Sequence, residues 1–382
     1  MLTLLCISLI AQDVGAQSFS ESEWQIIRSL SPAVLQKDAT NAFETNKEAA
    51  TLGQHLFFDK RLSSNGEVSC ATCHIPEKYF TDGLSVSQGI KPLDRNAPSV
   101  LNAAHQRWFF WDGRTDTLWG QPIQTIEHPS EMNMSRSEAL SIIQQDDVLH
   151  KQWNNLFGAM ESRTEDENAA MLSKSIAAYI TSLSAANAPF DAFVNGDNSA
   201  ISESAKRGLH FFITDGGCLR CHFGPWFTDG SFHSVGVPPL NGGPLKDSGR
   251  YGAIDQLKQA EFGAGSEFSE DKNGMRATIT KHIAKRKDDW GAFRTPSLRN
   301  VAKTSPFMHA GQLATLDEVI EHYSTLENFV SADHHRETIL IPLNMTEQQK
   351  EDLKAFLETL TAPLPDEALL TDPRQVNLEH AQ

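Results

Sequence analysis

Two copies of the pattern Cys-x-x-Cys-His constrain this chain more than any other feature of its sequence. The copies are Cys70-Ala-Thr-Cys73-His74 and Cys218-Leu-Arg-Cys221-His222. The pattern is the attachment signature of c-type haem, in which two thiols bond to the haem vinyl groups and the adjacent histidine binds the iron. The sequence therefore predicts two covalently bound haem c groups, with His74 and His222 as iron ligands.

The four motif thiols could bind zinc instead of haem. Zinc ribbons bring their cysteine pairs within about twenty residues of each other, whereas Cys73 and Cys218 are far apart in the chain. A histidine directly after each second cysteine also favours haem. The one other cysteine, Cys6, lies in an apolar N-terminal run, so a disulfide framework is not expected.

The first ten residues form a short apolar run, and Val14-Gly-Ala16 after it has the small-residue pattern of a signal-peptidase site. The run is too short to span a bilayer. We therefore expect residues 1–16 to be a cleaved export signal. The mature protein would begin at Gln17 and reside in the periplasm. A lipid anchor on Cys6 is the alternative interpretation.

The length and charge of the chain limit its organisation and its partners. Its 382 residues are enough for two domains with separate cores. A formal net charge of -16 argues against nucleic acid or an anionic membrane as a partner, because both favour basic surfaces. The acidity is compatible with docking of a basic electron-transfer protein, and equally with simple solubility.

The surroundings of the two motifs are repeated. Gly53-Gln-His-Leu-Phe-Phe58 and Phe80-Thr-Asp-Gly83 flank the first motif, and Gly208-Leu-His-Phe-Phe212 and Phe227-Thr-Asp-Gly230 flank the second. This repetition predicts two related cytochrome c-like haem domains in one chain. Small and polar residues from Asn187 to Ser199 mark the boundary, so we place the domains at residues 17–190 and 191–382.

Helical periodicity predicts a mainly α fold. Apolar residues recur on one face from Glu21 to Leu30 and from Glu167 to Leu183. Thr346 opens a capping box with Gln349 and begins a third helix. No run of alternating strands is evident. The segment 236–272 is rich in glycine and charge, and we expect it to be a surface excursion.

Beyond the motifs, the chain resembles the bacterial di-haem cytochrome c peroxidases and their MauG-type relatives from Leu52 to about Leu360. The most specific segments are Leu56-Phe-Phe-Asp-Lys-Arg-Leu-Ser63, Arg95-Asn-Ala-Pro98, Trp111-Asp-Gly-Arg114, Pro296-Ser-Leu-Arg-Asn300 and Thr304-Ser-Pro-Phe-Met-His-Ala-Gly311. The resemblance implies a peroxidatic N-terminal haem domain and an electron-transferring C-terminal one. It also implies calcium between them, at Asn96, Thr304 and Pro306, although an asparagine near a proline is usually a turn residue.

The open side of the first haem decides its chemistry, because a six-coordinate iron passes electrons whereas a vacant site can bind peroxide. Many of these peroxidases carry a distal histidine in the loop after the first motif. By resemblance, Ile90 occupies that place here. Isoleucine cannot ligate iron, so a five-coordinate first haem of MauG type is expected. His105 or His55 as a replacement ligand is the alternative.

Cleavage of a peroxide O–O bond needs a proton moved between its oxygens, so a nearby carboxylate is useful. The family pattern places Gln121 and Glu131 in this pocket, and both are present. Glu131 would act as the general acid and base, and Gln121 would position water or peroxide. The alternative is that Glu131 only pairs on a surface turn, as loop glutamates commonly do.

Two further aromatic residues complete the expected electron path. Trp111 would lie between the haems by resemblance and assist electron transfer, although a large aromatic is ordinarily core. The sixth ligand of the second haem would be Tyr323, the MauG-type choice, where peroxidases use methionine. A phenolate is a harder, anionic donor than a thioether and lowers the potential. Met308 and His322 are nearby alternatives.

The resemblance implies an oxidoreductase that uses hydrogen peroxide, and three hypotheses follow. A MauG-type enzyme would oxidise a protein substrate by long-range electron transfer. A cytochrome c peroxidase would take electrons from a small cytochrome c or a cupredoxin. A non-enzymatic di-haem carrier would have two six-coordinate irons. Ile90 and Tyr323 favour the first hypothesis, and Gln121 with Glu131 argues against the third.

Overall fold

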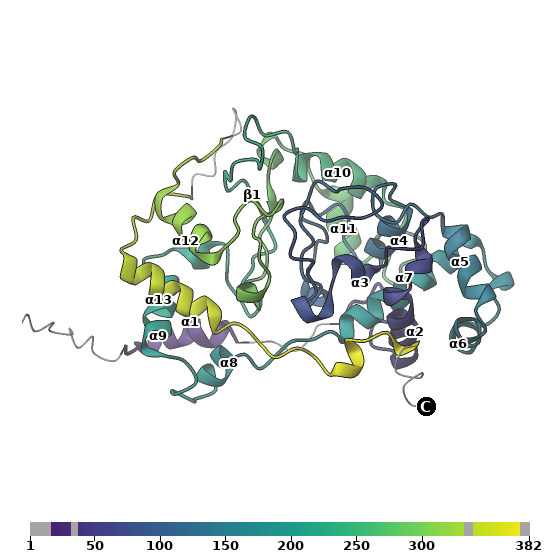
Figure 1. Ribbon diagram of the computed structural model, residues 1–382, viewed down its shortest axis with the longest axis horizontal. Helices are drawn as coiled ribbons and strands as arrows, with labels where there is room; N and C mark the ends of the chain where they lie inside the picture. The colour runs from purple at the N-terminus through teal and green to yellow at the C-terminus, as the bar shows by residue number, and fades with distance from the viewer. Residues whose placement is uncertain (1–16, 32–36, 332–338, 375–382) are drawn as a thin grey trace, which may run out of the picture.

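The computed structural model describes residues 17–31, 37–331 and 339–374 (Figure 1). The expected export signal at 1–16 lies outside these residues. The described chain is mainly helical, as predicted, with a single two-residue strand pair joining β1 to β2. The helices and strands are α1(Glu21–Ser29), α2(Lys47–Phe58), α3(Cys70–Cys73), α4(Gly120–Glu127), α5(Arg136–Gln145), α6(Asp147–Phe157), α7(Glu165–Ser182), α8(Pro189–Val194), α9(Glu203–Ile213), β1(Phe232–His233), α10(Arg250–Gln259), α11(Met275–His282), β2(Phe293–Arg294), α12(Leu316–Thr325) and α13(Glu347–Glu358).

Two hydrophobic cores lie on opposite sides of the molecule (Figure 1). The first is built around α2 and α7, and the second around α9 and α13, which share the largest helix–helix contacts of each side. In both pairs a glycine allows close approach. A Cβ on Gly53 would lie 1.9 Å from the carbonyl oxygen of Ser175, and one on Gly208 would lie 1.9 Å from that of Asp352. The repeat seen in the sequence is therefore a repeat in packing.

Segments cross between the two cores. The N-terminal helix α1 buries Ile27 in the second core, beside α9 and α13. In the opposite direction, Phe262 from the C-terminal half of the chain joins the first core at 3% exposure. The boundary at residues 190 and 191 stays a prediction, and the packing adds that neither core is made from one continuous stretch of chain.

The predicted helices are confirmed, but the expectation for residues 236–272 was wrong. Ser20 and Glu23 form a capping box at the start of α1, and Thr346 and Gln349 form one at the start of α13. Residues 236–272, expected to be a surface excursion, contain α10 and bury Phe262. Because the segment is rich in glycine and charged residues, its sequence did not indicate that some of its apolar residues would be buried. None of the helices among the described residues is long and apolar enough to cross a membrane.

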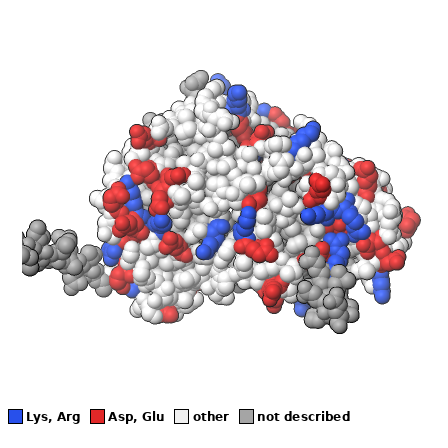
Figure 2. Space-filling view, in the orientation of Figure 1, with Lys and Arg blue, Asp and Glu red and all other residues white. Residues whose placement is uncertain are grey.

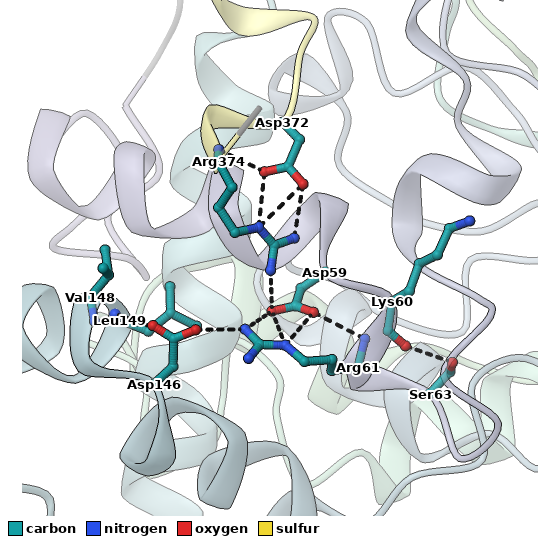
Figure 3. A network of polar contacts seen from close by, with 9 residues as sticks. All are labelled: Asp59, Lys60, Arg61, Ser63, Asp146, Val148, Leu149, Asp372 and Arg374. Carbon is teal, nitrogen blue, oxygen red and sulfur yellow. Dashed lines mark hydrogen bonds and ion pairs between the residues drawn. The ribbon is translucent and has the colours of Figure 1, made fainter. Parts of the chain in front are cut away.

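An ionic network ties the C-terminal end of the described chain to the first core (Figure 3). Asp59, directly after α2, has a side chain only 1% exposed and pairs with Arg61 at 2.6 Å and with Arg374 at 3.0 Å. Arg61 also pairs with Asp146, and Arg374 with Asp372. Burial alone would raise the pKa of Asp59, but the hydrogen bonds and charges of Arg61 and Arg374 lower it. A buried carboxylate thus remains charged and holds three segments together.

We expect Gly208→Ala to lower the stability of the folded protein. Alanine is favoured over glycine in a helix by about 1 kcal/mol, but the added methyl overlaps the backbone of α13, and overpacking of this kind costs about 1–3 kcal/mol. Thermal unfolding of the haem-loaded protein measures the effect as a lower Tm. Gly265→Ala is the matched control, because its Cβ would meet only an ordinary contact at 3.7 Å. Equal Tm values for both variants would contradict the close-crossing interpretation.

Candidate active site: two haem cavities and the wall between them

The first Cys-x-x-Cys-His motif lines a cavity of about 1000 Å³. Its cysteines form the short helix α3, and His74 follows as the residue that ends it. The His74 Nδ1 atom lies 3.2 Å from the carbonyl oxygen of Phe80. A carbonyl only accepts hydrogen bonds, so Nδ1 carries the proton and Nε2 is left with a free lone pair. Burial lowers the pKa of His74, which favours the neutral imidazole that binds metals.

The second motif repeats this geometry in a cavity of about 350 Å³. His222 Nδ1 lies 2.8 Å from the carbonyl oxygen of Phe227, and burial lowers the pKa of His222 as well. Phe80 and Phe227 occupy matching places in the sequence repeat, and both have a left-handed backbone, with φ of 58° and 51°. The repeated Phe-Thr-Asp-Gly segments therefore supply the carbonyl that orients each histidine.

The residues around both cavities fit haem c. None of the four motif cysteines is in a disulfide, so all four are available for thioether bonds to haem. Arg294 adds an independent observation: it lines both cavities, is 4% exposed, and its Nε has no hydrogen-bond partner among the described residues. Burial lowers the pKa of Arg294 to about 10, still high enough to keep its charge at neutral pH. A buried cation without an acidic partner suits a ligand that brings carboxylates, as haem does.

The first cavity brings together the residues expected to handle peroxide. Gln121 projects from α4, and Glu131 comes from the loop that follows this helix. Glu131 Oε1 lies 3.6 Å from Arg114 Nη2 and 3.7 Å from His128 Nδ1. Burial, and to a lesser extent the charges of Cys73 and Glu131, raise the pKa of Cys70 to about 12. Glu131 and both cysteines of the motif line the same cavity.

Ile90, at the place of the distal histidine, and the two histidines considered as replacement ligands do not line the first cavity. Ile90 packs against the first core, and its N–H donates to the Glu131 carbonyl at 2.9 Å. His105 stacks on Trp226 with ring centroids 3.5 Å apart, and His55 is buried in α2. Neither histidine is among the residues that line the first cavity. The placement disfavours both as replacement ligands.

Tyr323 on α12 lines the second cavity together with His222. Burial, then the charges of Cys221 and Cys218, raises the pKa of the Tyr323 hydroxyl, and both cysteines line the same cavity. Met308 lines the same cavity. His322 instead directs Nε2 at the Val235 carbonyl oxygen, 2.9 Å away, and is not among the lining residues. The geometry favours Tyr323 over His322 and leaves Met308 as the alternative.

Trp111 belongs to the wall shared by the two cavities, as do Arg294 and His309. The Trp111 indole N–H donates to the Asn96 carbonyl at 2.9 Å, and its own carbonyl accepts from the Arg294 N–H at 2.8 Å. Arg250 from α10 fixes the following turn by donating to the Gly113 carbonyl at 2.6 Å. The indole is therefore rigidly held where an electron path between the cavities would pass.

The three expected calcium residues gather near this wall. Asn96 lines both cavities, while Thr304 and Pro306 line the second. The Asn96 side-chain N–H donates to the Leu84 carbonyl at 2.6 Å, which leaves the amide oxygen as the candidate ligand atom. The donor set suits a hard, oxygen-seeking cation.

Sequence reasoning missed Arg294, Arg114 and His128 as site residues. Arg114 and His128 lie in segments that the sequence singled out because of other residues, Trp111 and Glu131. Only the fold brings the side chains of Arg114 and His128 close to Glu131. Arg294 carries no local signal, because its position between the cavities depends on how the two sides of the molecule meet.

These features define a two-haem c-type redox enzyme, and comparisons with known proteins give its family. The model of the family described as di-haem cytochrome c peroxidase matches residues 47–199. The methylamine utilization protein MauG of Methylorubrum extorquens is 36% identical over 82% of this chain and 78% of that protein. Cytochrome-c peroxidase IdrP2 of a Pseudomonas species is 34% identical over 87% and 86%. The chain belongs to the di-haem cytochrome c peroxidase family.

Solved structures agree with this assignment. A MauG-like protein associated with microbial copper homeostasis superposes with a TM-score of 0.68 at 26% identity, over 90% of this chain and 97% of that one. The di-haem peroxidase BthA from Burkholderia thailandensis gives a TM-score of 0.66 at 25% identity, over 86% and 88%. Membership of the family makes the protein a peroxide-using di-haem oxidoreductase with two haem c groups. The relatives include both MauG proteins and peroxidases, so they do not separate the two subtypes.

Proposed function

We propose that the protein is a MauG-type enzyme, which reduces peroxide at the His74 haem and oxidises a protein substrate by long-range electron transfer. The observation that carries this proposal is the difference between the two cavities. The first is large and contains Glu131 and Gln121, whereas the second is smaller and contains the buried phenol of Tyr323. One cavity is equipped for a reactant and the other for a second protein ligand.

Haem bound in the first cavity would supply the iron at which peroxide is reduced. Glu131 would move a proton from one peroxide oxygen to the other, as a general base and then a general acid. Arg114 holds the Glu131 carboxylate by charge, and stacks its guanidinium over the Phe110 ring at 3.3 Å. Gln121, whose side-chain N–H donates to Thr125 at 2.9 Å, presents its amide oxygen to water or peroxide.

Electrons would leave the substrate protein, pass through the second cavity and cross the wall at Trp111. Reduction of one peroxide to two waters consumes two electrons and two protons, so a protein substrate must be oxidised by two electrons in total. Tyr323 as an anionic ligand would lower the potential of the second haem. The rigid packing of Trp111 suits a residue that passes electrons without moving.

The second candidate is a cytochrome c peroxidase that takes electrons from a small cytochrome c or a cupredoxin. The observation that supports this second candidate is that Met308 lines the second cavity. By resemblance, cytochrome c peroxidases use a methionine as the sixth ligand of the second haem. On the face in Figure 2, acidic and basic side chains are interspersed, and a broad upper area is largely uncharged. This face therefore offers no single-sign patch to identify the redox partner.

Three further assignments belong to the proposal. The protein would act in the periplasm after removal of residues 1–16. Calcium would bind between the haem domains at Asn96, Thr304 and Pro306, whose placement beside the wall supports the assignment. The domain from 17 to 190 would hold the peroxidatic haem, and that from 191 to 382 the electron-transfer haem.

We expect Glu131→Gln to slow the reaction with peroxide about 100-fold or more, because glutamine keeps the shape of the side chain but cannot carry the proton. Stopped-flow mixing of the holoenzyme with hydrogen peroxide measures the rate. Glu77→Gln, an exposed carboxylate near the first motif, is the control and should react normally. An unchanged rate in Glu131→Gln would remove this residue from the mechanism.

Tyr323→Met should convert the ligand set of the second haem to His/Met. We expect its reduction potential to rise by on the order of 100 mV, since axial ligands tune haem potentials over a wide range. Spectroelectrochemical titration of the holoenzyme measures this shift. Met308→Leu is the matched variant and should leave the potential nearly unchanged. The opposite pattern would identify Met308 as the ligand and favour the cytochrome c peroxidase candidate.

A further inference from the structure

We propose that His128 is the relay residue through which protons from solvent reach Glu131. The inference rests on the proposed function, because it takes Glu131 as the group that handles the protons of peroxide reduction. Each peroxide requires two protons in addition to two electrons: H2O2 + 2H⁺ + 2e⁻ gives 2H2O. These protons must be delivered from outside the cavity during every turnover.

Glu131 needs a partner for this delivery. Its side chain is 17% exposed, and two nitrogen-bearing side chains, Arg114 and His128, lie within 4 Å of its carboxylate. Arg114 is itself only 18% exposed, and a guanidinium does not give up its proton in proteins. Histidine is the side chain whose ordinary titration falls between pH 5 and 8, so it can both take and give a proton. His128 is therefore the neighbour with suitable chemistry.

The position of His128 connects the carboxylate to solvent. Its Nδ1 lies 3.7 Å from Glu131 Oε1, while 46% of its side chain is exposed. Both side chains line the first cavity. The loop is fixed by its backbone, since the N–H groups of Glu131 and Asn133 both donate to the His128 carbonyl at 3.0 Å. One edge of the imidazole thus faces the carboxylate, and the rest of the ring reaches water.

The other charged groups near His128 are either already paired or unsuited to a proton relay, so Glu131 is the partner of His128. Glu127, the preceding residue on α4, is paired with Arg136 at 2.7 Å. The loop packed against His128 and Glu131 carries Lys91, whose backbone N–H donates to the Ser130 carbonyl at 3.1 Å and whose side chain is exposed. Lysine stays protonated across the working range of histidine and does not replace it as a relay.

The proton step can be written in full. Protonated His128 gives its Nδ1 proton to the Glu131 carboxylate, so an N–H bond breaks, an O–H bond forms and the ring becomes neutral. A small rotation of the half-exposed ring closes the 3.7 Å gap. The neutral ring then turns toward solvent, takes a proton at Nδ1 and returns. In the neutral state Nδ1 accepts from the Ser130 N–H at 3.3 Å, a long contact that rotation readily breaks.

The test compares His128→Gln and His128→Ala in the holoenzyme with His150→Gln, a control on α6 that lines neither cavity. We expect His128→Gln to react with hydrogen peroxide at least about 10-fold more slowly at pH 7. Its rate should also be independent of pH between 5 and 8, whereas the relay predicts a pH-dependent rate for the unmodified protein. Added imidazole should restore the rate of His128→Ala, because it replaces the missing proton carrier.

A readout other than turnover is the binding of hydrogen cyanide, which must lose its proton as it binds ferric haem. We expect this association to slow in His128→Gln by a factor similar to that for peroxide. A normal pH profile in His128→Gln, or no imidazole rescue of His128→Ala, would mean that His128 is only structural and would overturn the relay. If Glu131→Gln reacts slowly with peroxide while His128→Gln reacts normally, the relay fails and the proposed function stands. If Glu131→Gln also reacts normally, the proposed function itself fails.

Discussion

The hydrogen bond from each motif histidine to a backbone carbonyl is the interaction on which the rest of the site depends. His74 and His222 each place Nδ1 against the carbonyl of a phenylalanine with left-handed backbone. The bond fixes the tautomer and the ring plane, so Nε2 of each histidine keeps its lone pair for a metal, and each histidine lines its cavity. Helix pairs of the same design, each with a glycine at its crossing, hold the two motifs in place. The duplication thus supplies two equivalent metal ligands.

The two cavities differ in the other side chains that line them beside each motif histidine. The first cavity receives Glu131 with Arg114 and His128 beside it, and the second receives Tyr323 from α12. The wall between them contains Trp111, held by hydrogen bonds at both its indole and its backbone, and the buried cation Arg294. This difference supports the proposal that the same scaffold serves a reactant on one side and electron transfer on the other.

Local patterns in the sequence predicted the parts of the structure that depend on local physics. One-sided apolar periodicity marked α1, a capping box marked the start of α13, and the two motifs with their flanking repeats marked both haem cavities. The sequence also placed Trp111, Gln121 and Glu131 by resemblance, and their side chains do line one cavity. The helix starts and the repeated motifs need only spacing along the chain, whereas the three pocket residues depend on the resemblance.

The remainder depends on contacts between distant segments. The burial of Phe262 in the first core could not be seen in a segment of glycine and charge, because its partners lie in the other half of the chain. The same is true of α1, whose apolar face was recognised but whose place in the second core was not. His128 is a single loop histidine, and its proximity to Glu131 becomes visible only when the loop is folded.

The central claim is that the two haems are unlike, one with an open site and one with two protein ligands. Electron paramagnetic resonance of the fully oxidised holoenzyme tests it most directly, because spin state reports the ligand field of each iron separately. The account requires one high-spin ferric signal, from the His74 haem, together with one low-spin signal from the His222 haem. Two low-spin signals would contradict the account, because they would mean that a protein side chain closes the first site as well.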